Sequence, residues 1–199
     1  MVEQHQQELK KQLWNIANTL RGNMSADDFR DYILGLIFYK YLSDKLNQYA
    51  DTLLSEDGIT FTAIDEKSED GKEILAAIQI EAIDTLGYYF KPSALFHVLA
   101  HDGENGEFIL DDVRDVLNAI EQSTMGSDSA DDFNGLFDEL DLTSNKLGKT
   151  PDARNKLVAQ ILAHLNNINF HLESSEIDIL GDAYEYLIGM FASGAGKKA

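Results

Sequence analysis

The sequence holds one cluster of basic side chains, between residues 142 and 170, where four cations face a single acid, Asp152. Lysine and arginine neutralise nucleic-acid phosphates, and amide or hydroxyl groups add hydrogen bonds to them. One interpretation of this cluster is therefore contact with phosphate or with another subunit. The other is ordinary solvated charge around the start of a helix. The candidate contact residues are Asn145, Lys146, Lys149, Arg154 and Lys156.

A second pair of lysines lies near the C-terminus, in the run from Gly194 to Lys198. A phosphate-binding loop needs glycine where Phe191 stands, and Ser or Thr where Lys198 stands. Such a loop also joins a strand to a helix, whereas this run follows a predicted helix. We therefore predict a hinge or linker over residues 193–199, in which Lys197 and Lys198 are candidate contacts to DNA or to a neighbouring domain.

Two histidines, His97 and His101, are four residues apart on a predicted helix. The zinc-peptidase pattern has glutamate directly after its first histidine, and Val98 occupies that position here. We interpret both as ordinary surface or interface histidines. The sequence therefore predicts no metal ligands.

Acidic side chains dominate the chain, which has a formal net charge of -19. Residues 101–141 hold thirteen acids against one cation, Arg114. Neither acidic run within them has the D-x-D-x-D-G register of a calcium loop, so we expect a solvated acidic face. The rival interpretation is that these acids imitate DNA phosphate or dock a basic partner. A surface this acidic repels phosphate, so we expect the chain by itself to bind DNA poorly. The two runs are Glu107 with Asp111, Asp112 and Asp115, and Asp128 with Asp131 and Asp132.

The composition is that of a globular chain with a substantial core. Its 199 residues are 44% hydrophobic and 10% aromatic, and they include no cysteine. Disulfides and thiolate chemistry are thereby excluded. The mean hydropathy is -0.26, no apolar run approaches the length of a membrane span, and the polar N-terminus does not read as a signal peptide. We expect a cytoplasmic location and no membrane partner.

Apolar residues recur at helical spacing along almost the whole chain, so helices must position the candidate side chains. Ser25 suits the N-cap of one long helix over about 26–54, and its middle, from Ile33 to Leu42, is apolar nearly all round. Thr150 and Pro151 form a strong start to a later helix. Residues 59–62 alone suggest a short strand, which has no partner. The predicted fold is all-α and bundle-like, with about seven or eight helices and no substantial sheet. The predicted helices cover residues 4–19, 26–54, 73–86, 93–100, 110–122, 130–137, 150–167 and 178–192, which places the helical domain at 1–192.

Five segments, in order, resemble the modification (M) subunit of type I restriction–modification systems. The resemblance covers essentially the whole chain. In that family a helical N-terminal domain precedes an adenine-specific DNA methyltransferase domain. The segment after residue 177 resembles the connection between those two domains. The matching segments are residues 13–22, 29–44, 89–96, 141–170 and 178–199.

The resemblance implies a parent enzyme that uses S-adenosylmethionine to methylate adenine N6 in duplex DNA. It also implies a second M subunit, a specificity subunit and, in the nuclease form, a restriction subunit as partners. The family's catalytic Asn-Pro-Pro motif is absent, because the only prolines are Pro92 and Pro151, and no glycine-rich cofactor loop is visible. We therefore predict no catalytic and no cofactor-binding residue in this chain.

The expected task is structural: holding M subunits together, embracing DNA with the catalytic domain, and coupling to the specificity subunit. The alternative is a free-standing acidic helical adaptor or a DNA-mimic protein. The aromatic residues are expected to lie in the core, and the alternative is that they stack on bases. The set is Trp14, Phe29, Tyr32, Tyr39 and Tyr41.

Overall fold

The structure, a computed structural model, describes residues 2–20, 25–125, 135, 137–173, 181, 185, 186 and 189. Within these residues the elements with defined bounds are six α-helices and three short 3₁₀ turns, and no strand occurs. The all-α prediction is confirmed. No helix in the described part is long and apolar enough to cross a membrane.

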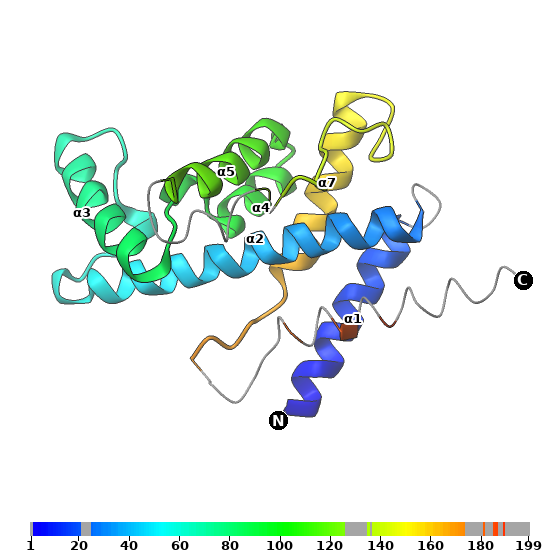
Figure 1. The fold of residues 1–199 in the computed structure, drawn as a ribbon, viewed down its shortest axis with the longest axis horizontal. Helices are drawn as coiled ribbons and strands as arrows, with labels where there is room; N and C mark the ends of the chain where they lie inside the picture. The colour runs from blue at the N-terminus through cyan, green and yellow to red at the C-terminus, as the bar shows by residue number, and fades with distance from the viewer. Residues whose placement is uncertain are drawn as a thin grey trace, which may run out of the picture.

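Helix α2 (Ala26–Leu53) is the long central helix, and three of the other helices pack directly against it. The Ser25 hydroxyl caps its N-terminus by accepting a hydrogen bond from the Asp28 backbone N–H at 3.2 Å. Its middle is buried as predicted, since Ile33, Leu36 and Ile37 are fully inaccessible. Figure 1 shows α2 running along the long axis of the described part.

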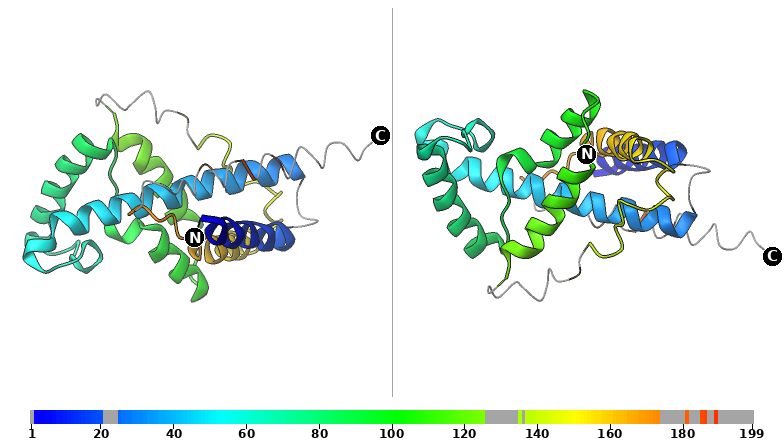
Figure 2. Two further views of the ribbon diagram at one scale, coloured as in Figure 1. Left: turned by 90° about the horizontal axis from the view of Figure 1, so that it is seen from below. Right: turned by 90° about the horizontal axis from the view of Figure 1, so that it is seen from above.

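The remaining helices divide between the two ends of α2. Helices α1 (Val2–Leu20) and α7 (Pro151–Asn166) contact each other near its N-terminal end. Helix α3 (Glu69–Leu86) packs near its C-terminal end. Helices α4 (Phe96–Glu104) and α5 (Leu110–Ser123) lie between them, and α4 packs closely on α7. Figures 1 and 2 show this division from three directions.

Several local signals locate the helix ends. Thr150 caps α7 through the Ala153 backbone N–H at 3.2 Å, with Pro151 in the first turn. Gly87 ends α3 in the left-handed conformation, at φ 87°. That helix begins four residues earlier than predicted, because Ser68 accepts from the Gly71 backbone N–H at 3.0 Å and supplies a cap.

Two predicted elements differ from the structure. A 3₁₀ turn, Phe61–Ala63, occupies the place of the suspected strand at residues 59–62. At the start of this turn the Phe61 backbone N–H donates a hydrogen bond to the Asp51 carboxylate. The predicted helix 93–100 is instead a 3₁₀ turn, Pro92–Ala94, followed by α4. Extended backbone at Leu95 separates the two.

Most aromatic residues of the described part are buried or half-buried, but Trp14 and Phe108 are exposed. Tyr39 is fully buried and Tyr32 is 4% exposed, but the Trp14 side chain is 48% exposed. Trp14 lies beside the apolar stripe of α1, and that stripe is what faces the core through Leu9, Leu13 and Ile16.

Much of the predicted C-terminal region falls outside the described residues. Gly181, Glu185, Tyr186 and Gly189 are helical. The rest of the predicted helix 178–192, the linker 193–199 with Lys197 and Lys198, and most of the predicted helix 130–137 are not described. The division into domains therefore stays a prediction.

Candidate nucleic-acid or subunit interface

The predicted basic cluster surrounds the loop 141–149 and the first turns of α7. All five of its candidate residues within this stretch are described, and four are exposed while Arg154 is half-buried. Their neighbours decide which charges are available for a ligand. We call this region, residues 141–156 together with the N-terminal turn of α2, the junction.

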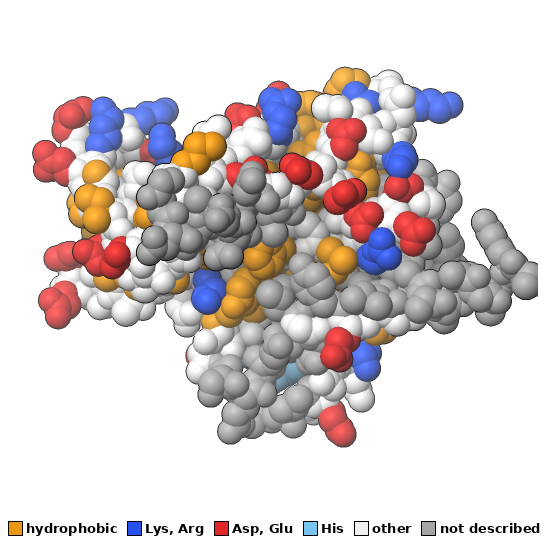
Figure 3. Space-filling model, viewed as in Figure 1, with side chains coloured by type: hydrophobic (Ala, Val, Ile, Leu, Met, Phe, Trp, Pro, Cys, Tyr) orange, Lys and Arg blue, Asp and Glu red, His pale blue; other side chains and the backbone are white. Residues whose placement is uncertain are grey.

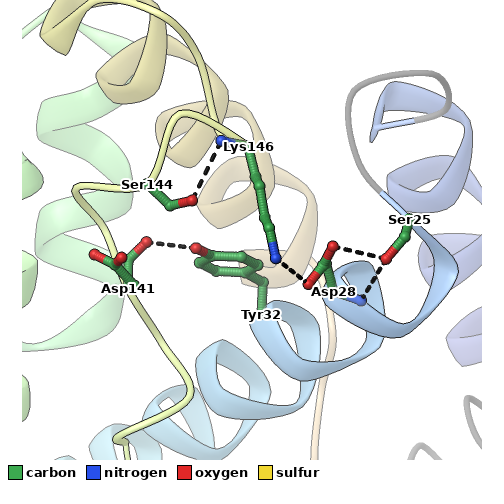
Figure 4. A network of polar contacts seen from close by, with 6 residues as sticks. All are labelled: Ser25, Asp28, Tyr32, Asp141, Ser144 and Lys146. Carbon is green, nitrogen blue, oxygen red and sulfur yellow. Dashed lines mark hydrogen bonds and ion pairs between the residues drawn. The ribbon is translucent and has the colours of Figure 1, made fainter.

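Lys146 is tied to the start of α2. Its Nζ lies 2.5 Å from Oδ1 of Asp28, and the Ser25 hydroxyl donates to the other carboxylate oxygen at 2.7 Å. These hydrogen bonds, that from Lys146 first, hold the pKa of Asp28 below its usual value. The same contact raises the pKa of Lys146. Figure 4 shows the lysine reaching across from the loop to the helix.

A second tie lies one turn further along α2. The Tyr32 hydroxyl donates a hydrogen bond to the backbone carbonyl of Asp141, and burial raises the pKa of Tyr32 (Figure 4). The Asp141 carboxylate turns back into its own loop and accepts from the backbone and hydroxyl of Thr143, at 2.9 and 2.7 Å. Those two bonds lower the pKa of Asp141. The loop is thus fastened to α2 at two points.

Arg154 closes the loop from the other side. Its Nη1 donates to Oδ1 of Asn145 at 3.3 Å and to the carbonyl of Gly148 at 3.2 Å. Gly148 leaves no room for a side chain, because a Cβ there would lie 2.9 Å from Cβ of Ala153 and 3.0 Å from the Arg154 backbone nitrogen. The hydrogen bonds of the Arg154 guanidinium and the close approach at Gly148 together hold the loop against α7.

Two of the predicted cations are left facing solvent. Lys149 and Lys156 are exposed, and neither forms an ion pair within the described residues. Lys156 also borders a groove of about 560 Å³ between α4 and α7, beside Phe108, whose side chain is 45% exposed. The small residues Ala159 and Ala163 line the same groove. The structure thus separates two outward lysines from three residues engaged inside the junction.

The sequence reasoning missed the partners of these residues on α2. Asp28 and Tyr32 are 118 and 109 residues away from Lys146 and Asp141. The sequence places Asp28 in the first turn of a helix, where an acid is favourable, but no local pattern pairs it with a distant lysine. No cluster of metal-ligating side chains occurs in the part of the chain that the structure describes.

Comparison with known proteins agrees with the segment resemblance. Residues 9–165 match the family described as the HsdM N-terminal domain. The methylase subunit of the type I restriction enzyme MpnII from Mycoplasma pneumoniae is 33% identical over 195 residues, which are 95% of this chain and 36% of that relative. The crystal structure of a type I restriction–modification methyltransferase subunit from Streptococcus thermophilus matches with a TM-score of 0.74 and 36% identity, over 94% of this chain and 39% of that one.

The chain thus spans little more than a third of the length of these relatives. The family match extends from the middle of α1 to the last turn of α7, so it includes the junction and the central helix. The chain therefore belongs to the HsdM N-terminal domain family, the helical N-terminal domain of type I restriction–modification methylase subunits.

Proposed function

We propose that this chain acts as the assembly and DNA-clamping domain of a methylase subunit. The whole protein transfers a methyl group from S-adenosylmethionine to adenine N6 in duplex DNA, and its partners are a second M subunit, a specificity subunit and, in the nuclease form, a restriction subunit. The observation that carries the proposal is the family match over residues 9–165. In this proposal, catalysis and cofactor binding belong to a part of the whole protein that this chain, covering 36% and 39% of its relatives, does not include.

The outward lysines of the junction are the contact points in this proposal. A net charge of -19 opposes any general attraction to DNA, so contact must be local. Lys149 and Lys156 present unpaired ammonium groups within the described residues, whereas Lys146 already serves Asp28. Because two contacts hold the loop 141–149 on α2, Lys149 sits on a preorganised support, and Lys156 lies on the adjoining helix α7. Domain closure around the duplex would then bring them to backbone phosphates.

The test uses the assembled complex of full-length methylase and specificity subunits on duplex DNA. Lys149→Ala/Lys156→Ala is compared with Lys67→Ala/Lys72→Ala, which removes the same charge near the start of α3. If both junction lysines touch phosphate, the slope of log K against log salt falls by roughly 1.8 per chain. The control pair should leave that slope unchanged.

Subunit docking is the other outcome for the same residues. In that case the double variant weakens assembly with the specificity subunit, measured by light scattering, and leaves the salt slope of the assembled complex intact. Unchanged assembly together with unchanged DNA binding would exclude the junction lysines from both roles. Tight, salt-sensitive DNA binding by the 199-residue chain alone would contradict the clamping proposal itself.

A further inference from the structure

A second groove lies away from the junction, between α4, α5 and the segment 89–94. It encloses about 620 Å³, and its polar edge includes Gln79 from α3. The floor is apolar and mostly buried in the core of the domain. The floor residues are Tyr89, Phe90, Leu99, Val116 and Ala119. We call this feature the α4–α5 groove.

Hydrogen bonds fix the segment 89–94, which forms one wall of the α4–α5 groove. The Ser123 hydroxyl accepts from the Tyr89 backbone N–H at 3.0 Å and donates to the Ile120 carbonyl at 2.8 Å. At the other end of the same segment, the Tyr39 hydroxyl of α2 donates to the Ala94 carbonyl at 2.5 Å. These bonds link the segment to α5 and to α2. At the start of α4, the Phe96 backbone N–H donates to the Ser43 hydroxyl of α2 at 2.7 Å, so α4 is fixed to the same central helix. A groove formed in advance requires little rearrangement when a ligand enters.

The rim of the groove is strongly acidic. Asp102, Asp112 and Asp115 line it, and Lys91 is the one basic residue among its lining. The Arg114 guanidinium is paired with two carboxylates. It lies 2.9 Å from Asp111 and 3.7 Å from Asp115, so the charge of Asp115 is the less fully compensated. Figure 3 shows acidic side chains gathered over α5 and toward α7. Burial, followed by repulsion from Asp115 and Asp111, raises the pKa of Asp112, so the rim carboxylates are close enough to disfavour one another's charge.

We propose that the α4–α5 groove docks a basic peptide segment of a partner protein, with lysine or arginine side chains on the acidic rim and an apolar side chain on the floor. Charge complementarity selects this occupant. The carboxylates repel nucleic acid, and each incoming cation relieves their mutual repulsion. The apolar floor adds a surface that an apolar side chain of the peptide can cover. The inference does not depend on the role of the junction lysines.

The experiment measures fluorescence anisotropy of labelled peptides with the 199-residue chain at 50 mM salt as an approximate starting condition. One peptide is Arg-Leu-Arg-Trp-Arg-Leu-Arg, and the second replaces its three apolar residues with glycine. The first should bind about tenfold more tightly than the second, because only it can occupy the floor. Asp112→Asn/Asp115→Asn should weaken the first peptide about tenfold.

Two further variants separate docking from general attraction to an acidic protein. Asp57→Asn/Glu139→Gln removes the same charge at exposed positions outside the groove and should leave the affinity unchanged. Ala119→Leu fills the floor without changing charge and should erase the preference for the apolar peptide. Melting curves establish that each variant is folded.

Amide chemical shifts locate the bound peptide independently. The largest changes should occur at Tyr89, Gln122 and Ser123, which line the groove. Equal loss of affinity in the rim variant and the control variant would overturn the proposal in favour of non-specific charge. So would shifts centred elsewhere, or equal binding of the two peptides, or no binding at millimolar peptide.

Discussion

Two lysine–aspartate pairs in this domain have the same separation and opposite surroundings. Nζ of Lys40 lies 2.5 Å from Oδ2 of Asp44, and Nζ of Lys146 lies 2.5 Å from Oδ1 of Asp28. The Lys40 side chain is 5% exposed, however, and the Lys146 side chain is 54% exposed. The first pair is inside the domain, and the second ties a surface loop to a helix start.

The carboxylates respond in opposite directions. Burial raises the pKa of Asp44, even though Lys40 opposes that shift. The pKa of Asp28 is lowered by Lys146 and then by Ser25. Lys40 is also held over the Phe170 ring, with Nζ 4.9 Å from its centre. Distance alone therefore does not set the energetics of an ion pair: desolvation dominates at Asp44, and hydrogen bonding dominates at Asp28.

The largest expected effect is that of breaking the buried pair. Lys40→Met should lower the free energy of unfolding by about 3 kcal/mol, because Asp44 would keep a poorly solvated charge without its partner. Urea denaturation measures the loss. Lys40→Met/Asp44→Leu should recover most of it, since both charges are then gone. A single variant as stable as the parent would show that burial does not distinguish the two pairs.

The junction should depend more on backbone fit than on its ion pair. Gly148→Ala should lower the free energy of unfolding by about 2 kcal/mol, since its Cβ would meet the α7 backbone. Gly106→Ala is the matched control, because no atom lies within 4 Å of its Cβ and only its positive φ of 84° opposes the change. Urea denaturation of both variants compares them. A Gly148→Ala variant as stable as the parent would mean that packing at Gly148 contributes nothing.

Breaking the exposed pair should have a small effect. Lys146→Met should lower Tm by only ~1–2 °C, because solvent screens the contact. Added salt should shrink the difference further. Lys72→Met, which breaks the exposed contact of Lys72 with Glu69 at 2.7 Å, provides a matched control for surface pairs. A loss approaching that of Lys40→Met would remove the contrast between the regions.

The smallest effect is a difference in the sign of the pH dependence. Asp28, with its lowered pKa, contributes stability above its unfolded value of 3.8 that is lost as pH falls through the folded pKa. Asp44, with its raised pKa, contributes stability below 3.8 that is lost as pH rises through the folded pKa. Carboxyl-carbon NMR titration should place the Asp44 midpoint above that of Asp28. The reverse order would contradict the assigned causes.

Local sequence signals account for much of the fold. Ser25, Thr150 and Gly87 sit at helix ends for reasons within a few residues of each. The apolar middle of α2 could be read from its composition, because a helix that is apolar nearly all round must be buried. The position of the basic cluster was readable too, since charge is a property of the residues themselves.

Only the tertiary structure decided what those charges do. Lys40 and Asp44 are neighbours on one helix, but the rings that cover the Lys40 ammonium, Phe96 and Phe170, belong to other segments. Lys146 meets Asp28 across 118 residues. The sequence determined which residues carry charge and where helices begin, through short-range hydrogen bonding and periodicity. The packed fold determined which charges are buried, tied or left for a partner, because desolvation depends on atoms brought together from distant parts of the chain.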